Sequence, residues 1–60
     1  MHRYDEALTD FDRAIELRPD DAQYHAGRGE IFRAMRRGGE ARADYSRAIE
    51  LDPRYQPPTL

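Results

Sequence analysis

Apolar residues recur in the first part of the chain at spacings of three and four positions. They are Tyr4, Ala7, Leu8, Phe11, Ala14 and Ile15, with polar residues between them. This spacing is typical of an amphipathic α-helix, because residues three and four apart share one face. Pro19 lacks an amide hydrogen and restricts the residue before it, so we expect this helix to end at residue 17 or 18.

The same periodicity predicts two further helices. Asp20 and Asp21 offer N-cap carboxylates for the second helix, and its apolar residues are Tyr24, Ile31, Phe32 and Met35. We expect Gly38-Gly39 to form the break that follows. The third helix carries Ala41, Tyr45, Ala48 and Ile49 and stops before Pro53. Short connections favour antiparallel neighbours, so the predicted fold is all-α with three helices.

Two glycines fall inside the second predicted helix. Gly27 and Gly29 each cost roughly 0.5–1 kcal/mol relative to alanine in a helix. A glycine there often marks a close approach of two helices, and Ala41 and Ala48 on the third helix are small enough to be the partners. We therefore expect the second and third helices to pack closely at these glycines. The alternative is that both glycines are tolerated defects.

The beginning and the end of the chain are two copies of one segment. Residues 1–20 and 35–54 align at an offset of 34 positions, so residues 13–17 recur as residues 47–51 and Pro19 recurs as Pro53. Units that repeat at such a period usually stack, and each depends on a neighbour to cover its apolar face.

The period and the residues together resemble the tetratricopeptide repeat, a helix–turn–helix unit of the same length. The matching residues are Gly29, Phe32, Ala41, Tyr45, Ala48 and Pro53 in one copy and Tyr4, Ala7, Phe11, Ala14 and Pro19 in the other. The chain departs from the family pattern at Gly38, where an aromatic residue is usual, and at His25, where tryptophan is common. Arg28 replaces a frequent leucine. The resemblance implies an antiparallel helical-hairpin repeat.

In this register the chain divides into three parts. Residues 1–19 resemble the second helix of an incomplete repeat, residues 20–53 one complete repeat, and residues 54–60 the lead-in to a further repeat. Stable solenoids generally need about three repeats and capped ends. We therefore expect either a fragment of a longer array or a homo-oligomer. The edge available for self-association is formed by Tyr4, Leu8, Phe11 and Ile15.

Composition narrows the possible functions. The 60 residues include no cysteine, which excludes disulfides and thiolate zinc sites. The net charge is −2, too small to imply a highly charged partner. No apolar run approaches the roughly 20 residues needed to span a bilayer. The N-terminus has no apolar segment of the signal-peptide type, so we expect a cytoplasmic location.

Candidates for catalysis or metal binding are sparse. His2 and His25 have no second histidine three or four positions away, and Ser46 lies inside a predicted helix rather than at a sharp strand–helix turn. We interpret carboxylates such as Asp44 as surface groups that pair locally, here with Arg47 at i, i+3. We expect no cofactor and no enzymatic activity.

The remaining function is recognition of another protein. In tetratricopeptide arrays, the first helices of successive hairpins line a groove that holds extended or helical peptides. The resemblance places Gln23, Ala26, Gly27, Glu30, Arg33 and Arg37 on that groove. Two alternatives stay open. The open helical edges could pair with copies of the chain, and, as the least favoured alternative, the arginines could contact nucleic acid.

Overall fold

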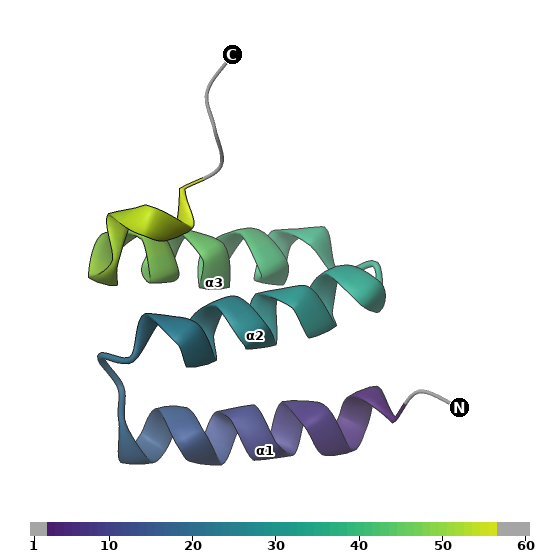
Figure 1. The fold of residues 1–60 in the computed structure, drawn as a ribbon. Helices are drawn as coiled ribbons and strands as arrows, with labels where there is room; N and C mark the ends of the chain where they lie inside the picture. Colours follow the sequence, from purple (N-terminus) through teal and green to yellow (C-terminus); the bar gives the residue numbers. More distant parts are fainter. Residues whose placement is uncertain (1–2, 57–60) are drawn as a thin grey trace.

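The computed structural model describes residues 3–56 as a row of three helices (Figure 1). The elements are α1 (Tyr4–Leu17), α2 (Ala22–Ala34), α3 (Gly38–Leu51) and a short 3-10 helix, η1 (Pro53–Tyr55). α2 lies between α1 and α3, and successive helices run in opposite directions. No strand occurs between residues 3 and 56. The expected all-α fold is therefore confirmed, whereas residues 57–60 of the expected lead-in lie outside the described part.

Local sequence explains where the helices begin and end. α1 ends at Leu17, two residues before Pro19, as expected. The Asp21 carboxylate caps α2 by accepting a hydrogen bond of 3.0 Å from the Gln23 amide. This bond satisfies one of the N–H groups that the first helical turn leaves free. The loop before α2 is held further by His25, whose Nε2 lies 2.8 Å from the Pro19 carbonyl oxygen.

The turn between α2 and α3 comes before Gly38-Gly39, so that part of the sequence prediction is wrong. α2 ends at Ala34, residues 35–37 make the turn, and the two glycines form the start of α3. Arg36 has a φ of 62°, the left-handed conformation that usually belongs to glycine, and its amide donates to the Arg33 carbonyl at 3.0 Å. The Arg37 amide donates to the Phe32 carbonyl at 2.8 Å, which completes a Schellman motif.

The interface of α2 with α3 is built from small side chains. Its centre is formed by Ala22, Ala26 and Ala48, with Leu51 packed against them. Gly29 belongs to the same interface, because a Cβ at this position would lie 3.3 Å from the Ala41 carbonyl oxygen. Small residues allow the two backbones to approach each other. The close approach expected at Gly29 is therefore confirmed.

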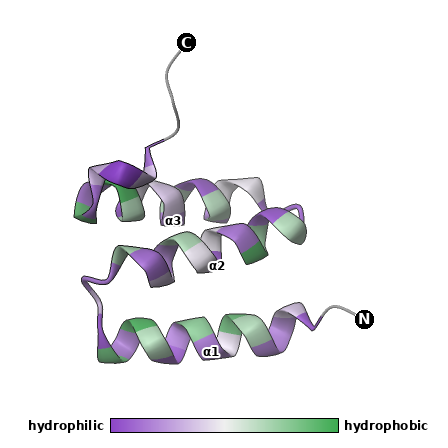
Figure 2. Ribbon diagram, viewed as in Figure 1, coloured by the Kyte–Doolittle hydropathy of each residue, from purple (hydrophilic) through white to green (hydrophobic). Residues whose placement is uncertain are grey.

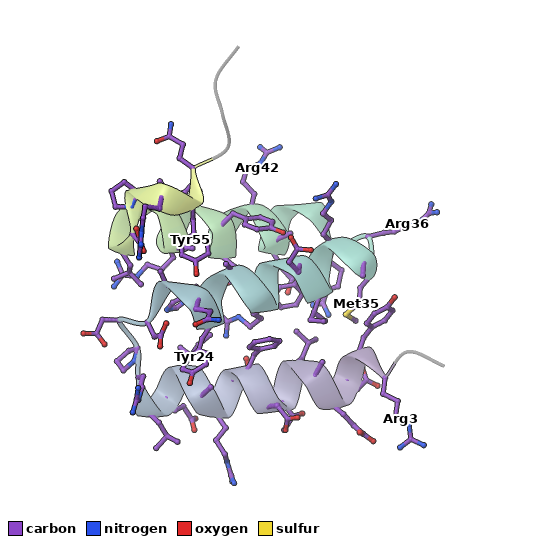
Figure 3. The ribbon with its side chains drawn as sticks, viewed as in Figure 1. Arg3, Tyr24, Met35, Arg36, Arg42 and Tyr55 are labelled. Carbon is purple, nitrogen blue, oxygen red and sulfur yellow. The ribbon has the colours of Figure 1, made fainter. Side chains whose placement is uncertain are left out.

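Gly27 serves the opposite interface, between α2 and α1. A Cβ at Gly27 would come within 2.5 Å of two ring atoms of Phe11, so the missing side chain makes room for that ring. The expectation that Gly27 packs against Ala41 or Ala48 of α3 is wrong. α2 has a neighbour on each side, and all three helices alternate hydrophobic and hydrophilic residues along their length (Figure 2). In Figure 3, Tyr24 also extends from α2 toward α1.

One arginine connects all three helices. Arg28 on α2 donates from Nε and Nη2 to the two carboxylate oxygens of Asp44 on α3, at 2.9 and 2.7 Å. Its Nη1 donates to Asp12 on α1 at 2.8 Å. Hydrogen bonding to Asp44, the largest cause, raises the pKa of Arg28, so this guanidinium remains charged. The expected pair of Asp44 with Arg47 is wrong, because Arg47 contacts Glu50 at 3.2 Å instead.

Candidate functional site

A groove of about 610 Å³ runs along α2 and α3, and we call it the α2–α3 groove. Its lining residues are Glu30 and Arg33 from α2, Gly38, Ala41, Arg42, Tyr45, Ser46 and Ile49 from α3, and Tyr55 from η1. The aromatic and aliphatic members give it an apolar surface, whereas charged side chains stand beside it. In Figure 3, Arg42 extends away from the helix bundle. An apolar surface with a few charged groups around it is typical of a site that binds a peptide or helix.

Tyr45 organises the polar side of this groove. Its hydroxyl donates a hydrogen bond of 2.5 Å to Glu30 Oε1, which joins α3 to α2. Burial is the main cause that raises the pKa of Tyr45, and the carboxylate of Glu30 raises it further, whereas Arg33 acts in the opposite direction. The phenol therefore keeps its proton at neutral pH and fixes the position of Glu30 beside the groove.

The internal repeat shows what kind of surface this is. Gly38, Arg42, Tyr45 and Ile49 on α3 stand 34 positions after Tyr4, Leu8, Phe11 and Ile15 on α1. On α1 this face is turned toward α2, where the Phe11 ring lies against Gly27. The chain thus contains one face of this type covered by a helix, and a second that lines an open groove.

The same placement shows how the residues of the expected self-association edge lie within one chain, and that edge stays a prediction. Phe11 was expected on an open edge with Tyr4, Leu8 and Ile15, and all four side chains are half-buried. Phe11 contacts α2 of its own chain. The large apolar side chain that α1 exposes is Leu17, of which 77% is accessible to solvent.

The predicted groove residues do not all lie together. Glu30 and Arg33 line the α2–α3 groove. Ala26 is buried in the interface with α3, and the Phe11 ring fills the space beside Gly27, so neither residue is open to a ligand. Arg37 is exposed but engaged, since its guanidinium bonds Glu40 at 2.6 and 2.7 Å and lies 5.0 Å from the centre of the Phe32 ring.

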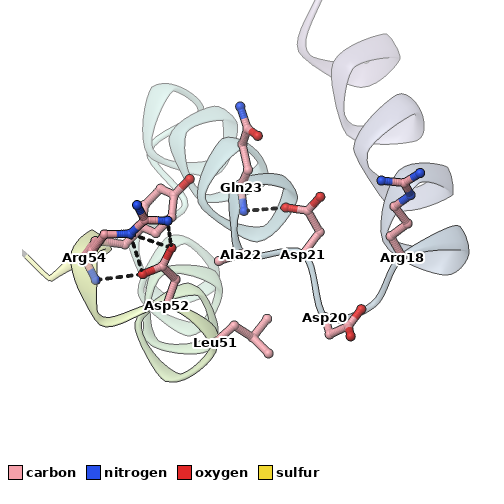
Figure 4. A pocket seen from close by; sticks show the side chains of 9 residues that line it. Arg18, Asp20, Asp21, Ala22, Gln23, Leu51, Asp52 and Arg54 are labelled. Atoms are coloured by element: carbon pink, nitrogen blue, oxygen red, sulfur yellow. Dashed lines mark hydrogen bonds and ion pairs between the residues drawn. The ribbon is translucent and has the colours of Figure 1, made fainter.

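Gln23 lies at a second, polar cavity of about 410 Å³ (Figure 4). There the loop between α1 and α2 meets the end of α3 and η1. Asp52 is already engaged by Arg54, whose Nη2 donates at 2.8 Å, and Asp21 caps α2. The side-chain hydrogen bonds between Asp52 and Arg54 are the largest cause that raises the pKa of Arg54 and lowers that of Asp52. The polar groups of this cavity thus stabilise the helix ends.

Sequence reasoning missed the α3 half of the groove. Tyr45 and Ile49 were placed on the apolar side of the third helix and Arg42 was given no role, although their offset of 34 positions from the apolar face of α1 was a usable signal. Among residues 3–56, no group of three or more histidine or acidic side chains is placed to hold a metal ion. Within the same part of the chain, no helix has the length and hydropathy required to cross a bilayer.

Comparison with known proteins agrees with this architecture. A family model described as tetratricopeptide repeat matches residues 1–55. Searches of curated proteins and of solved structures gave no match. Repeats of this family are typically non-catalytic and generally mediate interactions between proteins. The matched segment, the offset of 34 positions and the antiparallel helices together show that the chain belongs to the tetratricopeptide repeat family.

Proposed function

We propose that this chain is a non-catalytic protein-binding module that holds a peptide or helix against α2, in the α2–α3 groove. The observation that supports this proposal is the α2–α3 groove, in which Glu30 and Arg33 stand beside the apolar residues Tyr45 and Ile49. Burial of a partner's apolar side chains there supplies most of the binding free energy, because apolar surface leaves water. The charged side chains then select the partner's orientation.

The preferred partner is a helix rather than an extended strand. Within the chain, the face of α1 that corresponds to the groove is covered by a helix, α2, at a glycine. A helix with a small residue opposite Tyr45 fits the α3 face by the same geometry. Acidic residues along its edge would meet Arg42 and Arg33, which favours an amphipathic helix with carboxylates beside its apolar stripe.

The test is a selection of helical peptides from a random display library with the full chain as target. Selected peptides should lose most of their affinity for Ile49→Asp, which places a charge on the apolar surface, and for Arg33→Glu, which reverses a neighbouring charge. Arg47→Glu is the matched control, since Arg47 is exposed on α3 and does not line the groove. Peptides that bind all three variants with equal affinity would contradict the proposal.

Self-association is a second candidate, favoured by the weak enclosure of α1. Among the described residues of α1 none is buried, whereas α3 buries Ala41, Asp44 and Ala48. A helix held in this way can exchange between two copies, with α1 of one chain covering α2 of the other. Sedimentation at low micromolar concentration distinguishes the candidates. A dimer in which crosslinks join α1 of one chain to α2 of the other supports exchange, whereas a stable monomer contradicts it.

A further inference from the structure

The outer face of α1 has the same residues as a face of α3 that packs against α2. On α3 the residues Ala41, Asp44 and Ala48 are buried against α2. Arg28 of α2 binds both carboxylate oxygens of Asp44, and the next residue, Gly29, lies against the Ala41 carbonyl. The residues of α2 that recognise this face are therefore an arginine and the glycine that follows it.

α1 carries the same three residues at the same spacing. Ala7, Asp10 and Ala14 stand 34 positions before their counterparts on α3, and an α-helix places residues at this spacing on one side. Asp10 is exposed and has no hydrogen bond or ion pair within residues 3–56. Ala7 and Ala14 are only half-buried, because α2 covers the neighbouring side of α1 that carries Phe11.

We propose that this face, formed by Ala7, Asp10 and Ala14, binds a helix in which an arginine is followed directly by glycine. The arginine binds both oxygens of Asp10, as Arg28 does at Asp44. Lysine cannot replace it, because an ammonium group lacks the planar pair of donors. Glycine is favoured next to it because a Cβ in its place would lie close to the facing backbone, as it would at Gly29. This site lies on α1 and is independent of the α2–α3 groove.

The chain itself supplies a suitable probe, a synthetic peptide of residues 20–37, which contains Arg28-Gly29. A second form of the peptide is held helical by a lactam bridge on the side opposite the glycine, because a short peptide with two glycines forms little helix in water. Nuclear magnetic resonance of the full chain locates the bound peptide. We expect the largest shifts at Ala7, Asp10 and Ala14.

Variants of the full chain test the role of the carboxylate. Asp10→Asn should weaken binding about tenfold or more, because it removes the charge from a bidentate contact. Glu16→Gln is the matched control, an exposed carboxylate elsewhere on α1, and should leave the affinity unchanged. In a charge exchange, a peptide with Arg28→Glu should bind poorly to the unchanged chain and better to the Asp10→Arg variant.

Several results would overturn this inference. They are failure of the bridged peptide to bind, equal affinity for the unchanged chain and Asp10→Asn, and shifts confined to the α2–α3 groove. The Arg33→Glu variant keeps the two proposals apart, since it alters the groove and should bind this peptide normally. The site on α1 can therefore fail while the proposed function stands, and the reverse also holds.

Discussion

Arg28 and Asp44 lie 16 positions apart and form a two-bond ion pair across the interface of α2 with α3. Asp44 is buried, so removal of its partner or of its own charge leaves a polar group without compensation. Asp44→Ala should lower the free energy of unfolding by about 2–3 kcal/mol, less than for a fully enclosed pair because Arg28 remains partly exposed. Urea denaturation measures this change.

The double variant Arg28→Leu with Asp44→Ala should recover most of the loss. Apolar side chains that replace both members of an enclosed ion pair are often neutral or stabilising. Arg47→Ala provides the control, since its pair with Glu50 is exposed and should contribute less than about 1 kcal/mol. If the double variant is as unstable as Asp44→Ala alone, the unpaired charge of Arg28 is not the cause of the loss.

Alanine should have opposite effects on the free energy of unfolding at Gly29 and at Gly38. Gly29→Ala should lower the free energy of unfolding by about 1–3 kcal/mol, because the new Cβ would lie 3.3 Å from the Ala41 carbonyl oxygen. Gly38→Ala should raise it by about 0.4–1 kcal/mol, because Gly38 is helical with open space around the added atom. Thermal unfolding of the two variants compares them directly. Equal shifts would mean that the interface around Gly29 relaxes freely.

A glycine in the turn after α2 should stabilise the fold. Arg36 adopts a φ of 62° without being glycine, which strains its backbone. Arg36→Gly should therefore raise the free energy of unfolding by roughly 0.5–1 kcal/mol, since glycine is the preferred residue at this position of a Schellman motif. Arg36→Ala tests the cause, because it removes the same side chain and retains the strain. A gain from alanine as large as that from glycine would assign the effect to the arginine side chain.

Ionisation of Tyr45 should lower the stability of the fold in alkaline solution. Its pKa in the folded chain is raised, chiefly by burial and then by the bond to Glu30, so the fold favours the protonated phenol. This contribution is complete below the ordinary tyrosine pKa of about 10 and is lost as the pH rises through the higher folded value. Absorbance of ionised tyrosine should show a late titration step that disappears in Tyr45→Phe. Glu30→Gln should move that step to lower pH, and an unchanged step would contradict the role given to Glu30.

Much of the fold could be predicted from local sequence. Pro19 marks the end of α1, Asp21 caps α2, and the repeat places α3. The turn before α3 was misplaced because glycine permits a left-handed turn but does not require it. Arg36 takes that conformation while Gly38 stays helical. Local pattern alone does not distinguish these outcomes.

The site was harder to predict because α2 has two neighbours. Helical spacing identifies residues that lie away from one apolar stripe, and Ala26 and Gly27 satisfy that rule. Both are nevertheless covered, one by α3 and the other by Phe11 of α1. The pair of Arg28 with Asp44 also escapes local rules, which favour Arg47 three positions away. Glu30 and Arg33 line the α2–α3 groove, and their role in binding a partner stays a prediction.

A single guanidinium that touches every helix also makes their positions interdependent. Any change in the position of α1 would alter the separation of Asp12 from Arg28, whose guanidinium also holds Asp44 on α3. A shift of the first helix would therefore act on the same side chain that joins the second helix to the third. A leucine, which is frequent at this position in the family, could not bond either carboxylate, so in this chain a polar contact joins the three helices.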